Sequence, residues 1–330
     1  MNTFGRLFRI SIFGESHGEC VGITIDGCPA GLSLTAEDLL PDLERRKGGQ
    51  GKGTTPRKEE DYPIFKSGVF NGKTTGFPIT ILFENNNTRS EDYQKQRSIP
   101  RPGHADWVAN KKFGGNEDYR GGGHFSARLT TGLVAAGAVA RKLLNEISII
   151  ATVTEIAGES DLEKGLQKAI DAKDSVGGII ECRVSGMPVG LGEPYFDSLE
   201  SVLSHILFSI PAVKGVEFGA GFAAAKMFGS EHNDAIENTE GKTRTNNAGG
   251  VVGGISNGNE LVFRLVVKPT SSTPKEQNSL NWETGKTENF SVKGRHDLCV
   301  ALRAPVIVEA ATAIVLADFM LLEQRIKRVL

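Results

Sequence analysis

The sequence predicts one α+β domain over residues 1–330, with helices packed against antiparallel β-sheets. Strand-like segments come partly in runs rather than in strict alternation with helices, and such runs favour antiparallel sheets. No linker rich in proline, glycine or serine divides the chain. The polar stretches 229–248 and 273–292 lie between strong elements, so we interpret both as long functional loops.

The first elements are strands. Residues 7–13 (LFRISIF) and 21–26 (VGITID) have the composition and alternation of strands, and GESHGEC joins them. A further strand is expected at 78–84 (PITILFE). The polar residues 85–103 that follow it are expected to form a loop.

Two helices carry N-terminal capping signals. Thr35 and Asp38 form a capping box for a helix through about Glu44, and Ser160 with Glu163 begins another. Residues 127–146 form a helix whose middle is rich in alanine and glycine and nearly uncharged, which predicts burial on most sides. The remaining elements are strands at 147–157, 178–186, 215–228 and 260–268, and helices at 198–209 and 304–324.

Charge and composition exclude several classes of protein. The formal net charge is −2, which argues against a general nucleic-acid binder. No run approaches the roughly 18 consecutive apolar residues of a membrane span, and the N-terminus lacks the apolar region of a secretory signal. The four cysteines have no CxxC spacing, so no zinc ribbon, redox centre or other metal site is expected. We therefore expect a cytoplasmic protein.

Glycine is unusually abundant, at 40 of 330 residues, and clusters beside charged or hydroxyl residues. Glycine lets backbone amides approach a ligand closely, so these clusters are candidate ligand loops. One cluster is also strongly basic and indicates a site for a small anion rather than for a polyanion. Its basic residues are Arg45, Arg46, Lys47, Lys52, Arg57 and Lys58.

Three nucleophile or nucleotide motifs are absent or lack the context that they require. Residues 14–18 (GESHG) match the G-x-S-x-G pattern of serine hydrolases, which requires a strand, a sharp turn and a helix. The residues after Gly18 alternate as a strand, so Ser16 is expected in a strand-to-strand turn. No GKT triplet has the earlier glycine of a P-loop, and no GxGxxG spacing indicates a dinucleotide site.

Two histidines are candidate acids or bases. His17 and His104 each lie in a glycine-flanked turn with a carboxylate nearby, from Glu15 and Asp106 respectively. Histidine is the side chain that exchanges protons near neutral pH. Guanidinium groups bind carboxylates and phosphates bidentately, and arginines recur beside the glycines and histidines at Arg46, Arg101, Arg120, Arg128 and Arg295. Together they indicate a site that binds a compact polyanion and moves protons on it.

A phosphorylated cofactor is indicated by a hydroxyl-rich loop. Residues 268–272 (KPTSS) follow a strong strand, and their hydroxyls and amides suit a phosphate group. The glycine-rich residues 248–254 precede this loop and permit close backbone approach.

At these positions the sequence resembles the chorismate synthase family. The matching stretches occur in family order from residue 4 to about 320, and such an ordered set is far more specific than any single motif. They are FGESHG, DLERRKGGQGKG, RPGHAD, DYRGGGHFSAR, GMPVGLGEP, SIPAVKGVEFG, NNAGGVVGGISNG, KPTSS and GRHDLCVALRAPVIVEA.

The resemblance implies that helices pack between antiparallel sheets and that the chain forms a homotetramer. It also implies conversion of 5-enolpyruvylshikimate 3-phosphate to chorismate and phosphate by 1,4-anti elimination, a step of the shikimate pathway. The family requires reduced FMN, which is not consumed. The chain lacks the extra sequence of family members that reduce flavin with NADPH, so NADPH would act only through a separate flavin reductase. Because a site that excludes water strengthens electrostatic interactions, we expect the segments 45–58 and 85–103 to act as lids.

The resemblance also implies roles for individual residues. His17 and His104 would be the acids, and Asp297 would help the flavin N5 to lose a proton. Substrate contacts would come from Ser16, Arg46, Lys52, Arg101, Ser126, Arg128 and Arg295. The flavin would be lined by His124, Phe125, Ser126, Pro211, Ala212, Gly253, Lys268, Pro269, Thr270, Ser271, Ser272 and Arg295. NADPH, in members that use it, would lie near Arg46 and Lys52.

Two positions depart from the family pattern. The family usually has arginine at position 124 and often at position 52, where this chain has His124 and Lys52. Both residues keep a side chain that can carry a positive charge. Backbone contacts at position 124 would survive the change, whereas a contact specific to an arginine side chain would not.

Two alternatives make different predictions. A non-catalytic flavin- or phosphometabolite-binding protein would bind flavin without turnover, and the joint presence of His17, His104 and Asp297 argues against it. A serine hydrolase would be labelled at Ser16 by a fluorophosphonate and would need no flavin.

Overall fold

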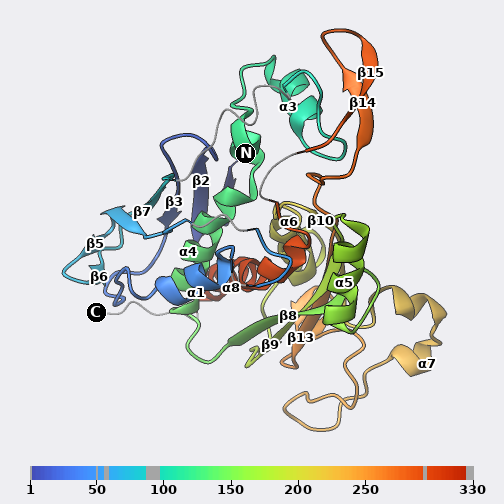
Figure 1. Ribbon diagram of the computed structural model, residues 1–330. Coiled ribbons are helices and arrows are strands. Elements are labelled where there is room, and N and C mark those ends of the chain that lie inside the picture. The colour runs from blue at the N-terminus through green and yellow to red at the C-terminus, as the bar shows by residue number, and fades with distance from the viewer. Residues whose placement is uncertain (1, 50, 56–58, 87–96, 293–295, 325–330) are drawn as a thin grey trace.

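Two antiparallel β-sheets enclose a pair of long helices in the computed structural model of the chain, which describes residues 2–49, 51–55, 59–86, 97–292 and 296–324 (Figure 1). The first sheet has the strand order β1-β2-β3-β7-β4, and the second has the order β10-β13-β9-β8. Neighbouring strands pair antiparallel in both sheets. The prediction of helices packed between antiparallel sheets is confirmed.

The strands of the two sheets are two to nine residues long. The first sheet consists of β1 (Thr3–Phe4), β2 (Arg9–Gly14), β3 (Cys20–Asp26), β4 (Ile64–Ser67) and β7 (Ile79–Glu84). The second consists of β8 (Ser148–Ile156), β9 (Gly178–Ser185), β10 (Val213–Phe218) and β13 (Leu261–Val267). Small hairpins are formed by β5 (Val69–Phe70) with β6 (Lys73–Thr74) and by β11 (Val251–Val252) with β12 (Ile255–Ser256).

Alternation along the strands decides which side chains enter the core. On β13, Leu261, Phe263 and Leu265 are at most 1% exposed and point to the helix side. Arg264, between two of them, faces the other way and pairs with Glu217 on the neighbouring β10, with 2.7 Å between Nη2 and Oε1. Because side chains alternate along a strand, one face of this sheet packs on helices and the other carries ion pairs.

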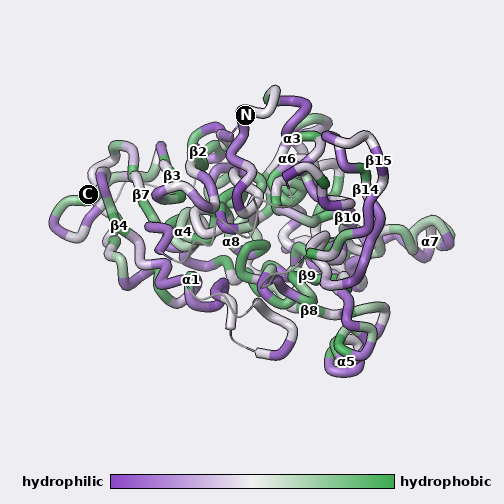
Figure 2. The backbone as a smooth tube through the Cα atoms, turned by 45° about the horizontal axis from the view of Figure 1, so that its top comes forward, coloured by the Kyte–Doolittle hydropathy of each residue, from purple (hydrophilic) through white to green (hydrophobic). Residues whose placement is uncertain are grey.

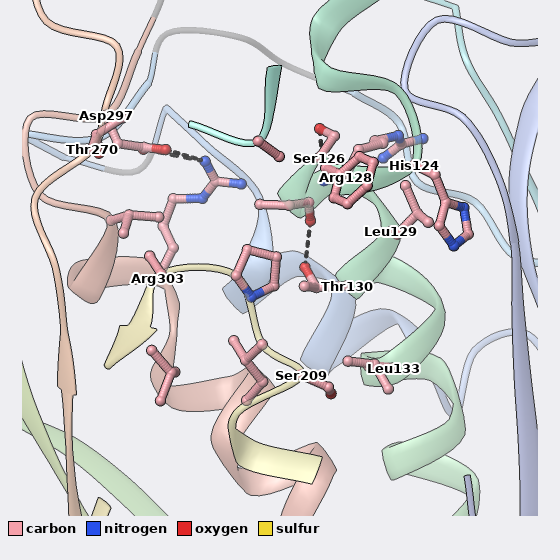
Figure 3. Close-up of a pocket in the computed structure, with 18 of the residues that line it drawn as sticks. His124, Ser126, Arg128, Leu129, Thr130, Leu133, Ser209, Thr270, Asp297 and Arg303 are labelled. Carbon is pink, nitrogen blue, oxygen red and sulfur yellow. Dashed lines mark hydrogen bonds and ion pairs between the residues drawn. The ribbon is translucent and has the colours of Figure 1, made fainter. Parts of the chain in front are cut away.

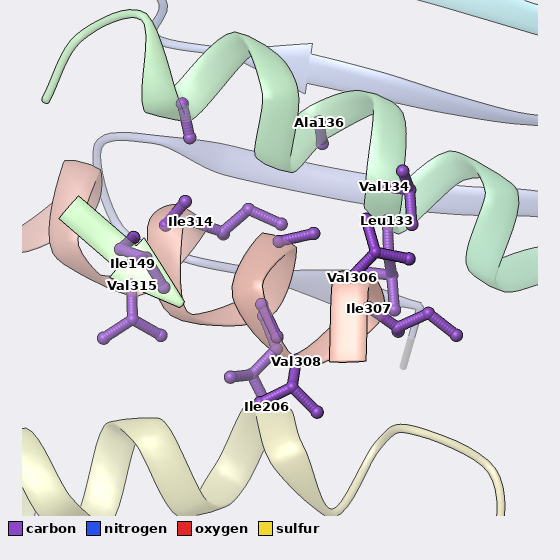
Figure 4. Packing of buried hydrophobic residues seen from close by; sticks show 14 of the residues in the cluster. Leu133, Val134, Ala136, Ile149, Ile206, Val306, Ile307, Val308, Ile314 and Val315 are labelled. Atoms are coloured by element: carbon purple, nitrogen blue, oxygen red, sulfur yellow. The ribbon is translucent and has the colours of Figure 1, made fainter. Parts of the chain in front are cut away.

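The central helices are α4 (Thr130–Arg141) and α8 (Pro305–Leu322), which pack against each other (Figure 4). Helix α4 lies on β3 of the first sheet, and α8 lies on β8 and β9 of the second. A Cβ atom added at Gly137 would lie only 2.3 Å from the Cα of Ala310, so the helices approach so closely that only glycine fits there. This explains why the middle of α4 is rich in alanine and glycine.

Smaller helices cover this centre. Helices α1 (Leu40–Arg46) and α6 (Leu199–Leu207) pack on the central pair, and α5 (Leu162–Ala172) packs on β8. In Figure 2 strongly hydrophobic residues gather at α8, while the residues of α1 are largely hydrophilic. The apolar core therefore lies where the two sheets and the two central helices meet.

Helix α8 is long and apolar enough to cross a membrane by length and composition, but 78% of it is buried inside the protein. Its two acidic residues are buried, and both accept hydrogen bonds. Asp318 accepts hydrogen bonds from the backbone N–H groups of residues 6–8 at 2.7–3.1 Å. Glu309 accepts both guanidinium arms of Arg45 at 2.7 and 2.8 Å. These contacts are typical of a core helix that joins surrounding elements.

Two predicted helix starts were wrong. The backbone N–H of Thr35 does donate to Asp38 at 2.7 Å, but in a turn before α1, which begins at Leu40. The cap of α5 is Asp161, not Ser160, because Asp161 accepts from the backbone N–H of Lys164 at 3.1 Å.

Several other elements differ from the prediction, among them the strands β1 and β4 and the two small hairpins, which were not expected. Strand β10 ends at Phe218 instead of residue 228, since Gly219 and Gly221 adopt positive φ, and η4 (Gly221–Lys226) and α7 (Gly229–His232) follow. The predicted loop 273–292 contains a hairpin of β14 (Gln277–Asn281) and β15 (Lys286–Phe290). Helix α3 (Asp106–Phe113) was not predicted.

Candidate active site

A cavity of about 760 Å³ lies beside the N-terminal end of α4 (Figure 3). Its walls come from the end of α1, the 3-10 helices η1 (Arg120–Phe125) and η2 (Ala127–Leu129), the segment after α6 and the 268–272 loop. The volume is in the range of cavities that hold cofactors and small substrates.

Most of the predicted site residues line this one cavity. They are His17, Arg46, Arg101, His104, His124, Phe125, Ser126, Arg128, Pro211, Ala212, Lys268, Pro269, Thr270, Ser271, Ser272 and Asp297. The structure thus brings together residues from seven separate sequence motifs.

Four predicted residues are placed differently. Ser16 is fully buried and lies behind Gly121 rather than in the cavity wall. Lys52 is exposed and does not line the cavity, and Gly253 is exposed in the turn between β11 and β12. Arg295 lies outside the described residues.

The glycine segment 121–123 lies against both predicted catalytic histidines. A Cβ added at Gly121 would lie 2.4 Å from Cδ2 of His17, and one at Gly122 would lie 3.3 Å from Nε2 of His104. Gly121 and Gly122 both have positive φ, at 59° and 83°. Only glycine allows this backbone to run so close to the two imidazole rings.

His104 belongs to a cluster with a carboxylate and a guanidinium. Its Nδ1 lies 2.6 Å from Oδ1 of Asp106. Arg101 donates to both Asp106 oxygens at 2.8 Å and to the Ser272 hydroxyl at 3.1 Å. Burial of Asp106 opposes its ionisation, but hydrogen bonds from Arg101 and His104 outweigh it and hold the pKa of the carboxyl well below its usual range. Asp106 therefore fixes the ring of His104.

A second cluster surrounds Asp61, which sequence reasoning missed. Its side chain is 1% exposed and accepts hydrogen bonds from Arg46 at 3.1 Å and from Arg128. Burial raises the pKa of Asp61, but the two guanidinium groups overcome this and lower it below its usual value. No sequence pattern marks this residue, because Asp61 follows the charged run RKEE and resembles a solvated surface residue.

Asp297 is held by two other elements. Arg303 donates to its Oδ2 at 2.9 Å, as Figure 3 shows, and the backbone N–H of Thr55 donates to its Oδ1 at 2.7 Å. Arg303 also donates to the carbonyl of Arg46 at 3.0 Å. Arg303 was not predicted, and it connects Asp297 to the basic segment.

The 268–272 loop has the chemistry of a phosphate site. Lys268 donates to the Ser271 hydroxyl at 2.7 Å, and Lys214, also missed by sequence reasoning, lines the same cavity. Burial and the charge of Lys214 lower the pKa of Lys268. A bound phosphate would relieve the repulsion between these two ammonium groups.

Three buried polar atoms at or next to the cavity have no hydrogen-bond partner in the part of the chain that the structure describes. They are Ser16 Oγ, Thr270 Oγ1 and His296 Nε2. Such orphaned atoms are rare in native proteins and commonly await a ligand or water. Together with Lys268 and apolar walls such as Leu133 and Val213, they fit a phosphorylated, partly apolar cofactor. The orphaned Ser16 hydroxyl also lacks the hydrogen-bonded base that a serine hydrolase requires.

His124 replaces the arginine that the family pattern leads us to expect. Its Nδ1 lies 2.9 Å from the carbonyl oxygen of Gly14, and since a carbonyl only accepts, Nδ1 carries the proton. The ring thus joins η1 to the end of β2. The imidazole lines the cavity but is shorter than the side chain of an arginine.

Comparisons with known proteins agree on one family. The family model for chorismate synthase matches residues 8–321. A chorismate synthase of Chitinophaga pinensis is 70% identical over 330 residues, covering 100% of this chain and 99% of the relative. One from Synechocystis sp. is 46% identical over 353 residues, covering 97% of each chain.

A solved structure agrees with the sequence relatives. A crystal structure of chorismate synthase superposes with a TM-score of 0.72 at 29% identity, covering 97% of this chain and 93% of the other. The family model and the relatives extend over nearly the whole chain, including every element that builds the cavity. The chain belongs to the chorismate synthase family.

Proposed function

We propose that this protein converts 5-enolpyruvylshikimate 3-phosphate to chorismate and phosphate by 1,4-anti elimination. It would be a carbon–oxygen lyase of the shikimate pathway and of aromatic amino acid biosynthesis, with residues 1–330 acting as one domain. The observation that carries the proposal is that one cavity holds His17, His104 and Asp297 together with the 268–272 loop.

The cationic side of the cavity suits the substrate, which carries two carboxylates and a phosphate. Arg46, Arg101 and Arg128 are each at most 8% exposed and already bonded to protein acceptors. Their side chains are therefore fixed before the substrate arrives, and their charges act in a site that excludes much water. Ser16, Ser126, Lys52 and Arg295 complete the proposed set of substrate contacts.

Reduced FMN, when bound, would supply electron density that assists the departure of the phosphate without net oxidation. The proposed flavin contacts are His124 to Ser126, Pro211, Ala212, Gly253, Lys268 to Ser272, and Arg295. Lys268 and the loop hydroxyls would hold the cofactor phosphate. His124 would contribute mainly through its backbone, because its ring bonds to the Gly14 carbonyl.

Three side chains would handle protons. His17 would donate a proton to the leaving phosphate. Its position fits this role, because it lies against Gly121 beside Ser16, a proposed substrate contact. His104, fixed by Asp106, would hold the protonation state of the cofactor. Asp297, fixed by Arg303 and the Thr55 amide, would accept a proton at the flavin N5.

We also propose that the enzyme is cytoplasmic, homotetrameric and monofunctional. NADPH would act only through a separate flavin reductase, although Arg46 and Lys52 mark where some family members contact NADPH. The test compares two mixtures of protein, substrate and FMN. Anaerobic mixtures with dithionite should release chorismate and phosphate in equal amounts, and aerobic mixtures with oxidised FMN and NADPH should release neither.

Either of two results would change the proposal. Flavin binding without any turnover in the dithionite mixture would favour a non-catalytic binding protein. Rapid aerobic turnover with NADPH and purified protein alone would show that the protein reduces its own flavin.

A further inference from the structure

His296 has no role in the mechanism above, yet it lines the same cavity. It directly precedes Asp297, whose carboxylate is anchored by Arg303 and the Thr55 amide. The backbone that carries His296 is therefore held at the cavity wall.

The Nε2 atom of His296 is buried and has no hydrogen-bond partner among the residues that the structure describes. Leaving a buried nitrogen unpaired is costly, so a native protein normally completes such a group with water or a ligand. The two other orphaned atoms at this site belong to Ser16 and Thr270, which are proposed substrate and flavin contacts. Of these three residues, only His296 has no proposed ligand to contact.

The surroundings of His296 keep its imidazole neutral. Burial lowers the pKa of His296, the charges of Arg101 and His104 lower it further, and Asp297 opposes them. Asp297 raises the pKa of His296 only in part, because its carboxylate already pairs with Arg303. A neutral imidazole offers one donor and one acceptor.

That charge state selects the kind of ligand. Phosphate and carboxylate groups are held best by cations, and Arg46, Arg101 and Arg128 already provide these. A neutral imidazole suits the edge of a heteroaromatic ring, where N–H and C=O groups alternate. Its neighbours His104 and Asp297 are the two residues that the proposed mechanism directs to the flavin.

We propose that His296 is a further cofactor-binding residue whose Nε2 forms a hydrogen bond with the polar edge of the flavin ring. This inference rests on the proposed function. It adds a further histidine to the cofactor site, one whose side chain binds the ring and that is distinct from the two proposed acids.

The test is the equilibrium dissociation constant of FMN, measured by quenching of flavin fluorescence with saturating 5-enolpyruvylshikimate 3-phosphate. His296→Phe removes the hydrogen bond and is expected to weaken FMN binding by about tenfold or more. His296→Gln keeps a donor and an acceptor and is expected to weaken it by less than about threefold. His232→Phe, in α7 and outside the cavity, is the matched control and should bind as the wild type does.

A second measurement covers the case in which His296→Phe does not fold. In wild-type protein labelled with ¹⁵N-histidine, the Nε2 resonance that is lost in His296→Gln should shift on addition of FMN but not on addition of inorganic phosphate. Wild-type FMN affinity in folded His296→Phe, or an Nε2 resonance that FMN leaves unmoved, would overturn the inference. Normal turnover by the wild type in the same preparations would show that the proposed function still stands.

Discussion

The Nδ1 atom of His104 lies 2.6 Å from a carboxylate oxygen of Asp106, which also receives two hydrogen bonds from Arg101. The arrangement fixes the imidazole ring with its Nε2 next to Gly122. His17 lies against the adjacent Gly121. One short glycine segment therefore sets the positions of both histidines relative to the cavity.

Replacing either histidine should reduce turnover with little effect on folding. His17→Ala and His104→Ala are each expected to lower kcat by about 10²–10⁴-fold, the range for loss of a positioned acid or base. Asp106→Asn should also lower kcat, but by less than His104→Ala does, because His104 would no longer be held in one orientation. Anaerobic chorismate formation measures kcat, with His232→Ala as the control. Near-normal turnover in His17→Ala or His104→Ala would remove that histidine from the mechanism.

A methyl group at Gly121 should damage the site. Its Cβ would lie 2.4 Å from the His17 ring and 2.9 Å from Ser16 Oγ, so Gly121→Ala must displace both side chains. Gly285→Ala is a matched control, because Gly285 also has positive φ, at 68°, but a Cβ there meets nothing within 4 Å. We expect similar melting temperatures for the two variants and a large loss of kcat/KM for Gly121→Ala alone. Equal kcat/KM values in the two would contradict this geometry.

The buried Asp61 should make stability depend on acid pH. Its pKa is lowered in the folded protein, so its contribution is present above the unfolded pKa of about 4 and is lost as the pH falls through the folded value. Asp61→Asn should cost about 3–5 kcal/mol of unfolding free energy at pH 7. It should also flatten the decline below about pH 5.

Urea unfolding at several pH values measures this effect. The control is Asp197→Asn, which breaks the exposed ion pair with Arg6 and should change stability little. If Asp61→Asn and the wild type lost stability in parallel as the pH falls, the paired carboxylate would not be the cause.

The basic segment should respond to ligands. Its described part docks on the site, since Gly53 accepts from the backbone N–H of Leu298 at 2.9 Å and Thr55 donates to Asp297. We expect peptides from 45–58 to exchange amide hydrogens faster in the free protein than with FMN and substrate bound. Mass spectrometry measures both states, and equal protection would argue against a lid.

Local patterns predicted most of the fold. The strand β3, the helix α4 and the apolar α8 follow from alternation and composition, which depend only on neighbouring residues. The hairpin β14–β15 was missed because QNSLN and KTENF are polar and largely solvent-facing. It is held by a contact that no local pattern contains, since Trp282 in its turn packs on Trp107 of α3 with ring centroids 5.9 Å apart.

Motifs predicted the site only in part. Glycine-flanked histidines and the KPTSS loop are visible in sequence, and the structure places them in one cavity. No local pattern marks Asp61 or Arg303, because Asp61 pairs with Arg128, 67 residues along the chain, and Arg303 bonds to the carbonyl of Arg46, 257 residues away. The resemblance to the family named Lys52 and Gly253 as contacts, and folding places both away from this cavity.

The proposed elimination needs reduced flavin but does not consume it. The most direct measurement is the number of chorismate molecules formed for each electron pair supplied, with FMN reduced once under strict anaerobiosis and the substrate in large excess. We predict far more than one chorismate for each reduced FMN, with the flavin still reduced at the end. One chorismate for each reduced FMN, or chorismate formation with fully oxidised FMN, would contradict the account.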